Sequence, residues 1–360
     1  MRLAFACLAI APFVAAQTTT SFTTPDGSRF VLVESRTVPL VHWAIATPED
    51  DPPRFQGLSF ATMRASLNGT WTTGSIDAER ERRALDAFDA AWHDWLQHVG
   101  DAEKSARLLT CKQEAEQLAD RAAFRRVLAT LPVHHPEVVE RSPFCLFVMT
   151  TTADALPDVA RVVVERRDQQ ALRDLQPLCT ETACLRDAAI AADPANALRA
   201  EVLALAIPDH PYGRRLERQP PASPLRSDGF TTWQTTQRPE RTVHVLLGSF
   251  DTATVRADLE RTFATTTLPA VAAPPVVTPR PITSMRRSAV NGLRTPTLAI
   301  AFVLPTTLDP RVLEATTRWL GEGPDAFLAL ELQRLGRKNA TVRCEAPWPP
   351  TILGKSLFVI

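Results

Sequence analysis

The sequence predicts an α+β protein built in two unequal parts, and three observations support this. Short runs rich in β-branched residues, such as 30–34 and 144–151, have strand character. Longer segments, of which 77–99 is the clearest, repeat apolar residues with a helical period. A proline-rich stretch without periodicity, 269–281, divides the chain. With 360 residues and 45% hydrophobic content, the chain can bury a core in more than one domain.

The charge balance gives no reason to expect a nucleic-acid or anionic-membrane partner. The 40 basic and 40 acidic residues cancel, so the net charge is zero. Arginines outnumber lysines by 36 to 4, but they are scattered among acidic residues. A compositional bias toward arginine explains this scatter better than a phosphate-binding surface does. We therefore expect no nucleic-acid partner.

The N-terminus has the pattern of a signal peptide. Arg2 precedes an apolar run from Leu3 to Val14, and small residues end the segment at Ala16, so cleavage is expected before Gln17. This run is too short to cross a bilayer, and no later run approaches about 18 apolar residues. The sequence thus predicts an exported protein, periplasmic or secreted, without a membrane span.

Five cysteines remain after the signal peptide, an odd number that allows at most two disulfides in an oxidising compartment. Cys179 and Cys184 are close enough in sequence to be a local pair, although a helix would hold them on different faces. No spacing is that of a C-x-x-C zinc pair. We expect no metal binding through cysteine.

The remaining elements follow in chain order. Phe22 to Thr47 is predicted to be a β-hairpin, with strands at 30–34 and 40–46. The segment His134-His135-Pro136-Glu137 is predicted to be a surface loop because Pro136 disfavours regular structure. His244 is expected to be a half-buried strand residue. Helices are expected at 77–99, 156–168, 195–207, 252–263, 311–320 and 326–335, and strands at 144–151, 297–304 and 357–360. The segment 241–251 is expected to be a strand followed by a turn.

A helix between Gly57 and Gly69 carries the most informative spacing. Phe60, Met63 and Arg64 stand at i, i+3 and i+4, which would place them on one face. In an inverted zinc motif, H-x-x-E-H, these positions hold two imidazole ligands and a carboxylate base. An ordinary amphipathic helix, with the apolar residues inward and the arginine in solvent, is the alternative.

The segment 54–70 resembles the motif helix of the insulinase-like (pitrilysin) metallopeptidases, Gly-Leu-x-His-x-x-Glu-His-x-x-x-x-Gly-Thr. Four residues match it in place, namely Gly57, Leu58, Gly69 and Thr70. His210-Pro-Tyr-Gly-Arg214 and the opening strand segment also resemble that family. The resemblance implies mixed sheets with helices on one face in two homologous domains, the second shortened. The implied boundaries are 1–16 for the signal peptide, 17–267 for the first domain, 268–284 for the linker and 285–360 for the second domain.

The same resemblance implies a degenerate active site. Phe60 and Arg64 replace the two histidine ligands, and Met63 replaces the general base. The third ligand position falls on Leu185, with Glu181 as the nearest carboxylate. Phenylalanine has no lone pair, a thioether is a poor base and a guanidinium repels a dication. We therefore expect no zinc, no other cofactor and no peptidase activity. We also expect Leu185 to pack against Phe60 and Met63, with Arg64 reaching water or Glu181.

An inactive member of such a family would act by binding. The resemblance implies an active peptidase relative, a second copy of this chain, or a peptide or protein ligand as partner. Two alternatives stay open. One is a zinc metalloendopeptidase with a relocated site around His134, His135 and Glu181. The other is a stand-alone binding module of the cell envelope.

Overall fold

The fold is known from a computed structural model of the chain. The structure describes residues 18–35, 39–49, 51, 55, 57–141, 144–192, 194–206, 224–268, 297–303, 309–321, 325–337, 342, 344–348 and 357–359. The predicted signal peptide, most of the predicted linker and the segment His210–Arg214 therefore lie outside the described residues. No helix within the described ranges is both long enough and apolar enough to cross a membrane.

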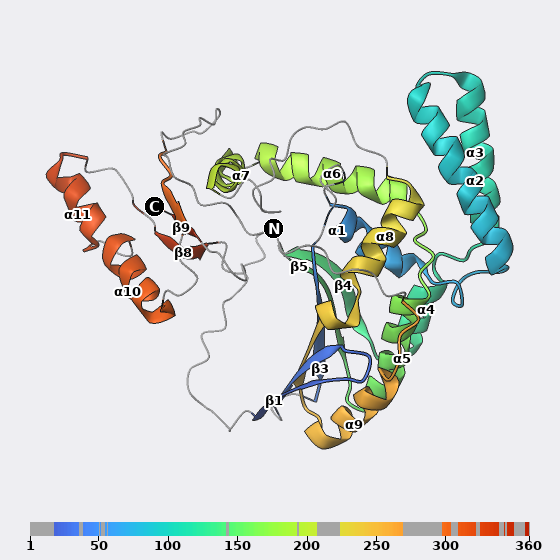
Figure 1. Cartoon of the computed structure of the whole chain (residues 1–360), viewed down its shortest axis with the longest axis horizontal. Coiled ribbons are helices and arrows are strands. Elements are labelled where there is room, and N and C mark those ends of the chain that lie inside the picture. Colours follow the sequence, from blue (N-terminus) through green and yellow to red (C-terminus); the bar gives the residue numbers. More distant parts are fainter. Residues whose placement is uncertain are drawn as a thin grey trace.

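Six strands form one mixed sheet in the order β1-β2-β6-β3-β5-β4 (Figure 1). Only β2 and β6 run parallel; all other neighbours are antiparallel. The strands are β1 Thr18–Thr23, β2 Arg29–Glu34, β3 Val41–Pro48, β4 His134–Arg141, β5 Phe144–Thr151 and β6 Val243–Gly248.

The predicted hairpin between Phe22 and Thr47 is wrong in its strand pairing. β2 pairs with β1 through a turn at Gly27 (φ 97°), whereas β6 lies between β2 and β3. A parallel pair needs a long connection, and the helices between β2 and β6 supply it. Sequence neighbours usually pair, and no local pattern identifies an inserted strand from much later in the chain.

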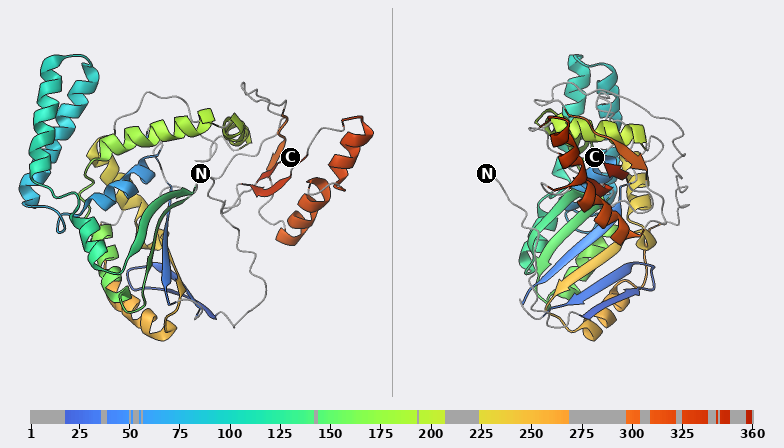
Figure 2. Two further views of the ribbon diagram at one scale, coloured as in Figure 1. Left: turned by 180° about the vertical axis from the view of Figure 1, so that it is seen from behind. Right: turned by 90° about the vertical axis from the view of Figure 1, so that its left-hand side faces the viewer.

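The helices of the main body cover one face of the sheet, and Figure 2 shows the strands on the opposite side. These helices are α1 Leu58–Ala65, α4 Ala123–Thr130, α5 Leu156–Asp168, α8 Arg226–Thr236 and α9 Thr252–Thr262. Helix α6 Leu175–Ala192 packs on α1, and α7 Pro194–Ala206 packs on α6. The predicted helices at 156–168, 195–207 and 252–263 are confirmed to within one residue at each end.

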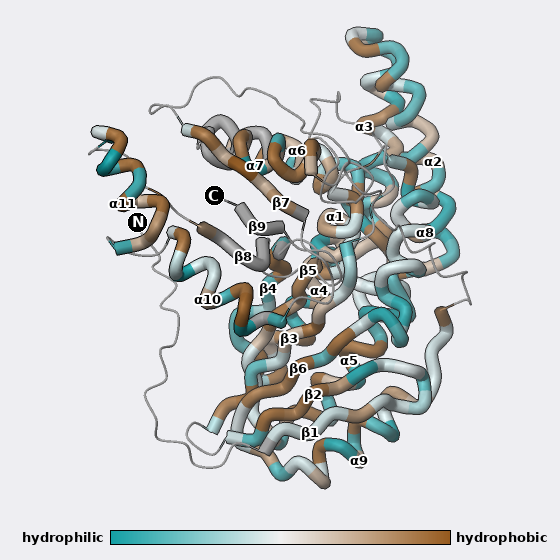
Figure 3. Tube along the Cα trace, turned by 60° about the vertical axis from the view of Figure 1, so that its left-hand side comes forward, coloured by the Kyte–Doolittle hydropathy of each residue, from teal (hydrophilic) through white to brown (hydrophobic). Residues whose placement is uncertain are grey.

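The core lies between the two layers. Alternate residues of the central strands point toward the helices, and Figure 3 shows apolar residues along these strands. The buried core includes Phe30, Leu32, Trp43, Ile45, Phe147 and Leu246 from the sheet and Leu58, Met63, Phe124, Val159, Val163 and Trp233 from the helices.

A helical hairpin projects from this body (Figures 1 and 2). It consists of α2 Ala78–Gln97 and α3 Ala102–Gln117. At the N-terminus of α2, the Asp77 carboxylate accepts a hydrogen bond from the backbone N–H of Arg80, at 3.0 Å. The hairpin contacts the body at the N-terminal part of α2, close to the end of α1.

The C-terminal part contains a small sheet and two helices. The three strands follow the order β7-β9-β8. Their bounds, and those of the helices, are β7 Ala301–Val303, α10 Pro310–Gly321, α11 Phe327–Arg334, β8 Glu345–Trp348 and β9 Leu357–Val359. Both predicted helices are confirmed, but the strand predicted at 297–304 is shorter. These elements do not establish a second homologous domain, so the α+β domain with six strands is what the structure supports.

Three local predictions need correction. The predicted loop at His134–Glu137 belongs to strand β4, where a bulge and a positive φ at His135 (52°) accommodate Pro136. His244 is fully buried instead of half-buried, in a cage formed by Phe30 and Phe263. Cys179 and Cys184 both lie on α6 as free thiols, so the proposed local disulfide does not form.

Candidate functional site

The N-terminus of α1 is held by a half-buried carboxylate, that of Asp51. Gly57 adopts the left-handed conformation (φ 85°) that begins the helix. Asp51 Oδ1 accepts a hydrogen bond from the Ser59 N–H at 2.7 Å, and its other oxygen accepts from the Gly57 N–H. Burial, together with the neighbouring Glu49, raises the pKa of Asp51 above its usual value. The Asp51 carboxylate thus satisfies two backbone N–H groups at the start of the helix.

Gly69 and Thr70, two of the residues that match the family motif, follow the C-terminal end of α1. Gly69 has φ 104°, and a Cβ there would lie 2.3 Å from Arg173 Nη1 and 2.7 Å from the Thr73 carbonyl oxygen. The Thr70 hydroxyl donates to Glu165 Oε1 at 2.6 Å. Glycine and threonine are therefore required here by packing, whether or not the helix holds a metal.

Arg64 and Glu181 join α1 to α6. Arg64 Nη2 lies 3.0 Å from both carboxylate oxygens of Glu181. The two side chains are 25% and 51% exposed, so the pair lies at the solvent boundary. The guanidinium also lies 5.8 Å from the ring centre of Phe60. The expected approach of Arg64 to Glu181 is confirmed.

The prediction that Leu185 packs against Phe60 and Met63 is wrong. Leu185 is 54% exposed. It follows Glu181 by one helical turn, and α6 continues past α1 toward α7 in Figure 1. A side chain one turn further along α6 therefore passes beyond the end of the contact with α1. Glu181 is the residue of α6 that bonds to Arg64.

Met63 also differs from its predicted position. It is 1% exposed and points into the core, where Arg166 Nη1 lies 3.1 Å and Gln237 Nε2 lies 3.9 Å from its sulfur. Consecutive residues of a helix are separated by about 100° around the axis. In this structure that angle turns Met63 toward α5 and the end of α8, whereas Arg64 turns toward Glu181 on α6.

Motif reasoning did not identify Arg166 and Gln237. A signal for the first exists in the sequence, because Val159, Val163 and Arg166 stand at i, i+4 and i+7 on α5. A basic residue on an otherwise buried stripe needs a specific environment. No comparable pattern marks Gln237, which lies just beyond the end of α8.

The residues at the motif positions do not fit zinc. Phe60 offers no donor atom, and both oxygens of Glu181 accept from Arg64. A cation bound here would have to displace the guanidinium and would lie beside its charge. Within the described part of the chain, no group of three histidine, cysteine, aspartate or glutamate side chains could hold a metal ion.

The alternative site around His134, His135 and Glu181 gains no support from this geometry. The two histidines lie at the start of β4, where the backbone bulges, and adjacent strand residues point to opposite faces. Glu181 is engaged by Arg64 on α6.

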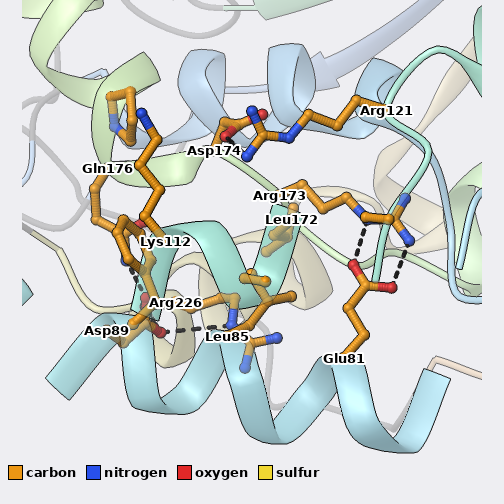
Figure 4. A pocket seen from close by; sticks show the side chains of 14 residues that line it. Glu81, Leu85, Asp89, Lys112, Arg121, Leu172, Arg173, Asp174, Gln176 and Arg226 are labelled. Atoms are coloured by element: carbon orange, nitrogen blue, oxygen red, sulfur yellow. Dashed lines mark hydrogen bonds and ion pairs between the residues drawn. The ribbon is translucent and has the colours of Figure 1, made fainter. Parts of the chain in front are cut away.

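A small cavity lies at the base of the helical hairpin (Figure 4). Its room for water-sized molecules is about 20 Å³, enough for roughly one water molecule. The buried ion pair between Glu81 and Arg173 forms one wall, and Asp89 beside Arg226 forms another. Burial raises the pKa of Asp89. This cavity is too small for an organic substrate.

No protein-family sequence model matches the chain. No curated protein sequence matches it either. Solved structures do match. A protease from Helicobacter pylori superposes with a TM-score of 0.64 at 13% identity, covering 95% of this chain and 74% of that one.

Two further matches come from related folds. An inactive domain of a peptidase M16 from Pseudomonas fluorescens gives a TM-score of 0.62 at 12% identity, with 95% and 73% of the two chains covered. The periplasmic protease PqqL from Escherichia coli gives a TM-score of 0.57 at 11% identity. The match covers 95% of this chain but only 35% of that longer chain. Identities this low show similarity of fold. The chain therefore has the fold of an M16, or insulinase-family, peptidase domain.

Proposed function

We propose that this chain is an exported, catalytically inactive M16-like protein that acts by binding. The observation that carries the proposal is the Arg64–Glu181 ion pair, which occupies the contact between α1 and α6 where the family motif would place its metal. The hydrophobic pattern of residues 1–16 supports export. Its partners in this proposal are a peptide ligand and either an active M16 peptidase or a second copy of the chain.

The protein is expected to retain well below one zinc per chain. The reason is the lack of metal-donor atoms, because the Phe60 side chain has no donor atom and the Glu181 carboxylate is paired with Arg64. Protein purified without chelator is loaded with zinc, desalted and analysed for metal. The double variant Phe60→His/Arg64→His is the matched control, because it places two imidazoles one turn apart beside Glu181. One zinc per wild-type chain after desalting would overturn the inactive assignment.

The edge strand β4 supports a peptide ligand. It is the last strand of the sheet on one side, and it packs next to α1. The bulge and Pro136 interrupt its first half, which leaves residues 137–141 in regular pairing with β5. An extended peptide can add to such an edge through main-chain hydrogen bonds. Exposed Glu137 would favour a peptide with basic residues.

Binding of an extended peptide is expected to slow amide hydrogen exchange in β4. The probe is a capped Val-Thr decapeptide with lysine at each end, added at millimolar concentration. Strand β1, which forms the opposite edge, is the control within the same molecule. Slower exchange in residues 137–140 with no change in β1 supports the proposal. Equal effects at both edges, or none in β4, would contradict it.

A further inference from the structure

Arg166 is a buried cation with an unusual set of neighbours. Its side chain is 1% exposed and lies on α5 beneath α1. Nη1 donates to Ser66 Oγ at 2.7 Å and approaches Met63 Sδ at 3.1 Å. The guanidinium lies over the rings of Phe147 (4.4 Å) and Trp233 (5.4 Å). Among the described residues, no carboxylate forms an ion pair with it.

This environment leaves the hydrogen-bonding capacity of the arginine poorly used. Its buried Nε has no hydrogen-bond partner in the described part of the chain. Burial lowers the pKa of Arg166 to about 9. By contrast, the neighbouring Arg167 is paired with both Asp26 and Asp168. An isolated buried charge is costly, and aromatic faces offset only part of that cost.

Two donors converge on the sulfur of Met63. Arg166 approaches it from α5 and the Gln237 amide from the end of α8, at 3.1 and 3.9 Å. A thioether is a weak acceptor, whereas a carboxylate accepts from a guanidinium and an amide at once. Glutamate and methionine side chains have nearly the same length, so a carboxylate at position 63 would reach the same donors.

We propose that Arg166 and Gln237 form a carboxylate-accepting site around position 63, which Met63 now fills. A glutamate at this position would form an internal ion pair with Arg166 and would not be free to take a proton from water. Peptidase chemistry is therefore blocked by the buried Arg166 and Gln237 as well as by the residues that replace the motif.

The first test compares variants at position 63 in the presence of Arg166. Met63→Glu, Met63→Gln and Leu58→Glu are unfolded with urea at neutral pH. Leu58 is buried on the same helix to the same 1% exposure, so it reports the ordinary cost of a buried carboxylate. We expect the unfolding equilibrium constant of Met63→Glu to be at least tenfold smaller than that of Leu58→Glu and no larger than that of Met63→Gln. Greater instability than Met63→Gln, or failure to fold, overturns the proposal.

A double-mutant cycle measures the interaction between a glutamate at position 63 and Arg166. Arg166→Met is combined with Met63→Glu, and the two single variants complete the cycle. Coupling of at least tenfold in the unfolding equilibrium constant is expected, because the double variant leaves the carboxylate buried without its cation. Should the double variant not fold while Met63→Glu does, that result also supports the pairing. Additivity within about twofold would show that the two positions do not interact.

Discussion

Replacing Arg173 with methionine is expected to lower the free energy of unfolding by about 3–5 kcal/mol. Arg173 binds Glu81 through Nε (2.5 Å) and Nη2 (2.8 Å) and also donates to the carbonyl oxygens of Asn68 and Thr70. Both charged side chains are fully buried. Removing the arginine leaves an unpaired carboxylate inside the protein and frees the end of α1 from α2. Urea unfolding of the variant measures the loss.

The control for Arg173 lies on the same helix as its partner. Arg83 pairs with Glu79 at 3.4 Å, but both side chains are more than two-thirds exposed. Arg83→Met should change the free energy of unfolding by less than about 0.5 kcal/mol. A loss of the same size in both variants would mean that burial does not decide the strength of the Arg173 pair. The flanking residues Leu172 and Asp174 have positive φ values, so the arginine is held by a strained turn.

Acid is expected to destabilise the protein through His244. The ring is fully buried against Phe30 and Phe263, and neither nitrogen has a hydrogen-bond partner among the described residues. Burial first, then the charges of Arg167 and Arg166, hold the pKa of His244 well below its usual 6.5. As the pH falls, His244 is therefore protonated in the unfolded chain while it stays neutral in the folded protein. Above pH 6.5, His244 is neutral in both states and does not lower the free energy of unfolding. Below pH 6.5, that free energy falls by about 1.4 kcal/mol per pH unit until the pH reaches the pKa of His244 in the folded protein.

The measurement is urea unfolding between pH 7.5 and 5, compared with the variant His244→Phe. Phenylalanine preserves the aromatic packing and removes the titrating group. The difference in unfolding free energy between the two proteins should be flat above pH 6.5 and should grow in favour of phenylalanine as the pH falls. Parallel pH profiles would show that His244 does not titrate differently in the folded and unfolded states.

Local elements could be predicted from the sequence because their causes are local. The helix at 156–168 appears with its predicted bounds, since its apolar spacing and flanking residues all agree. The motif helix appears between its two glycines, and both are required by φ values near 100° or by close packing. The resemblance in the residues around α1 also led to the right fold.

Partners between distant elements could not be predicted in the same way. The motif spacing predicts Leu185 at the contact with α1, but the crossing of α6 and α1 decides that Glu181 bonds to Arg64. The contact of Met63 with Arg166 depends on how α1 lies over α5. Spacing fixes which residues share a helix face, whereas the choice of neighbour across that face is made by the tertiary packing.

The central place of β6 has a consequence for how the protein folds. Arg29 pairs with Val243, and β6 is bordered on both sides by strands from the first fifty residues. During synthesis, β2 and β3 are complete long before β6 leaves the ribosome, and their inner edges stay open meanwhile. Pairing over such distances is slow and leaves strand edges exposed to other chains. A chain truncated before Val243 should therefore aggregate instead of forming a smaller version of this sheet.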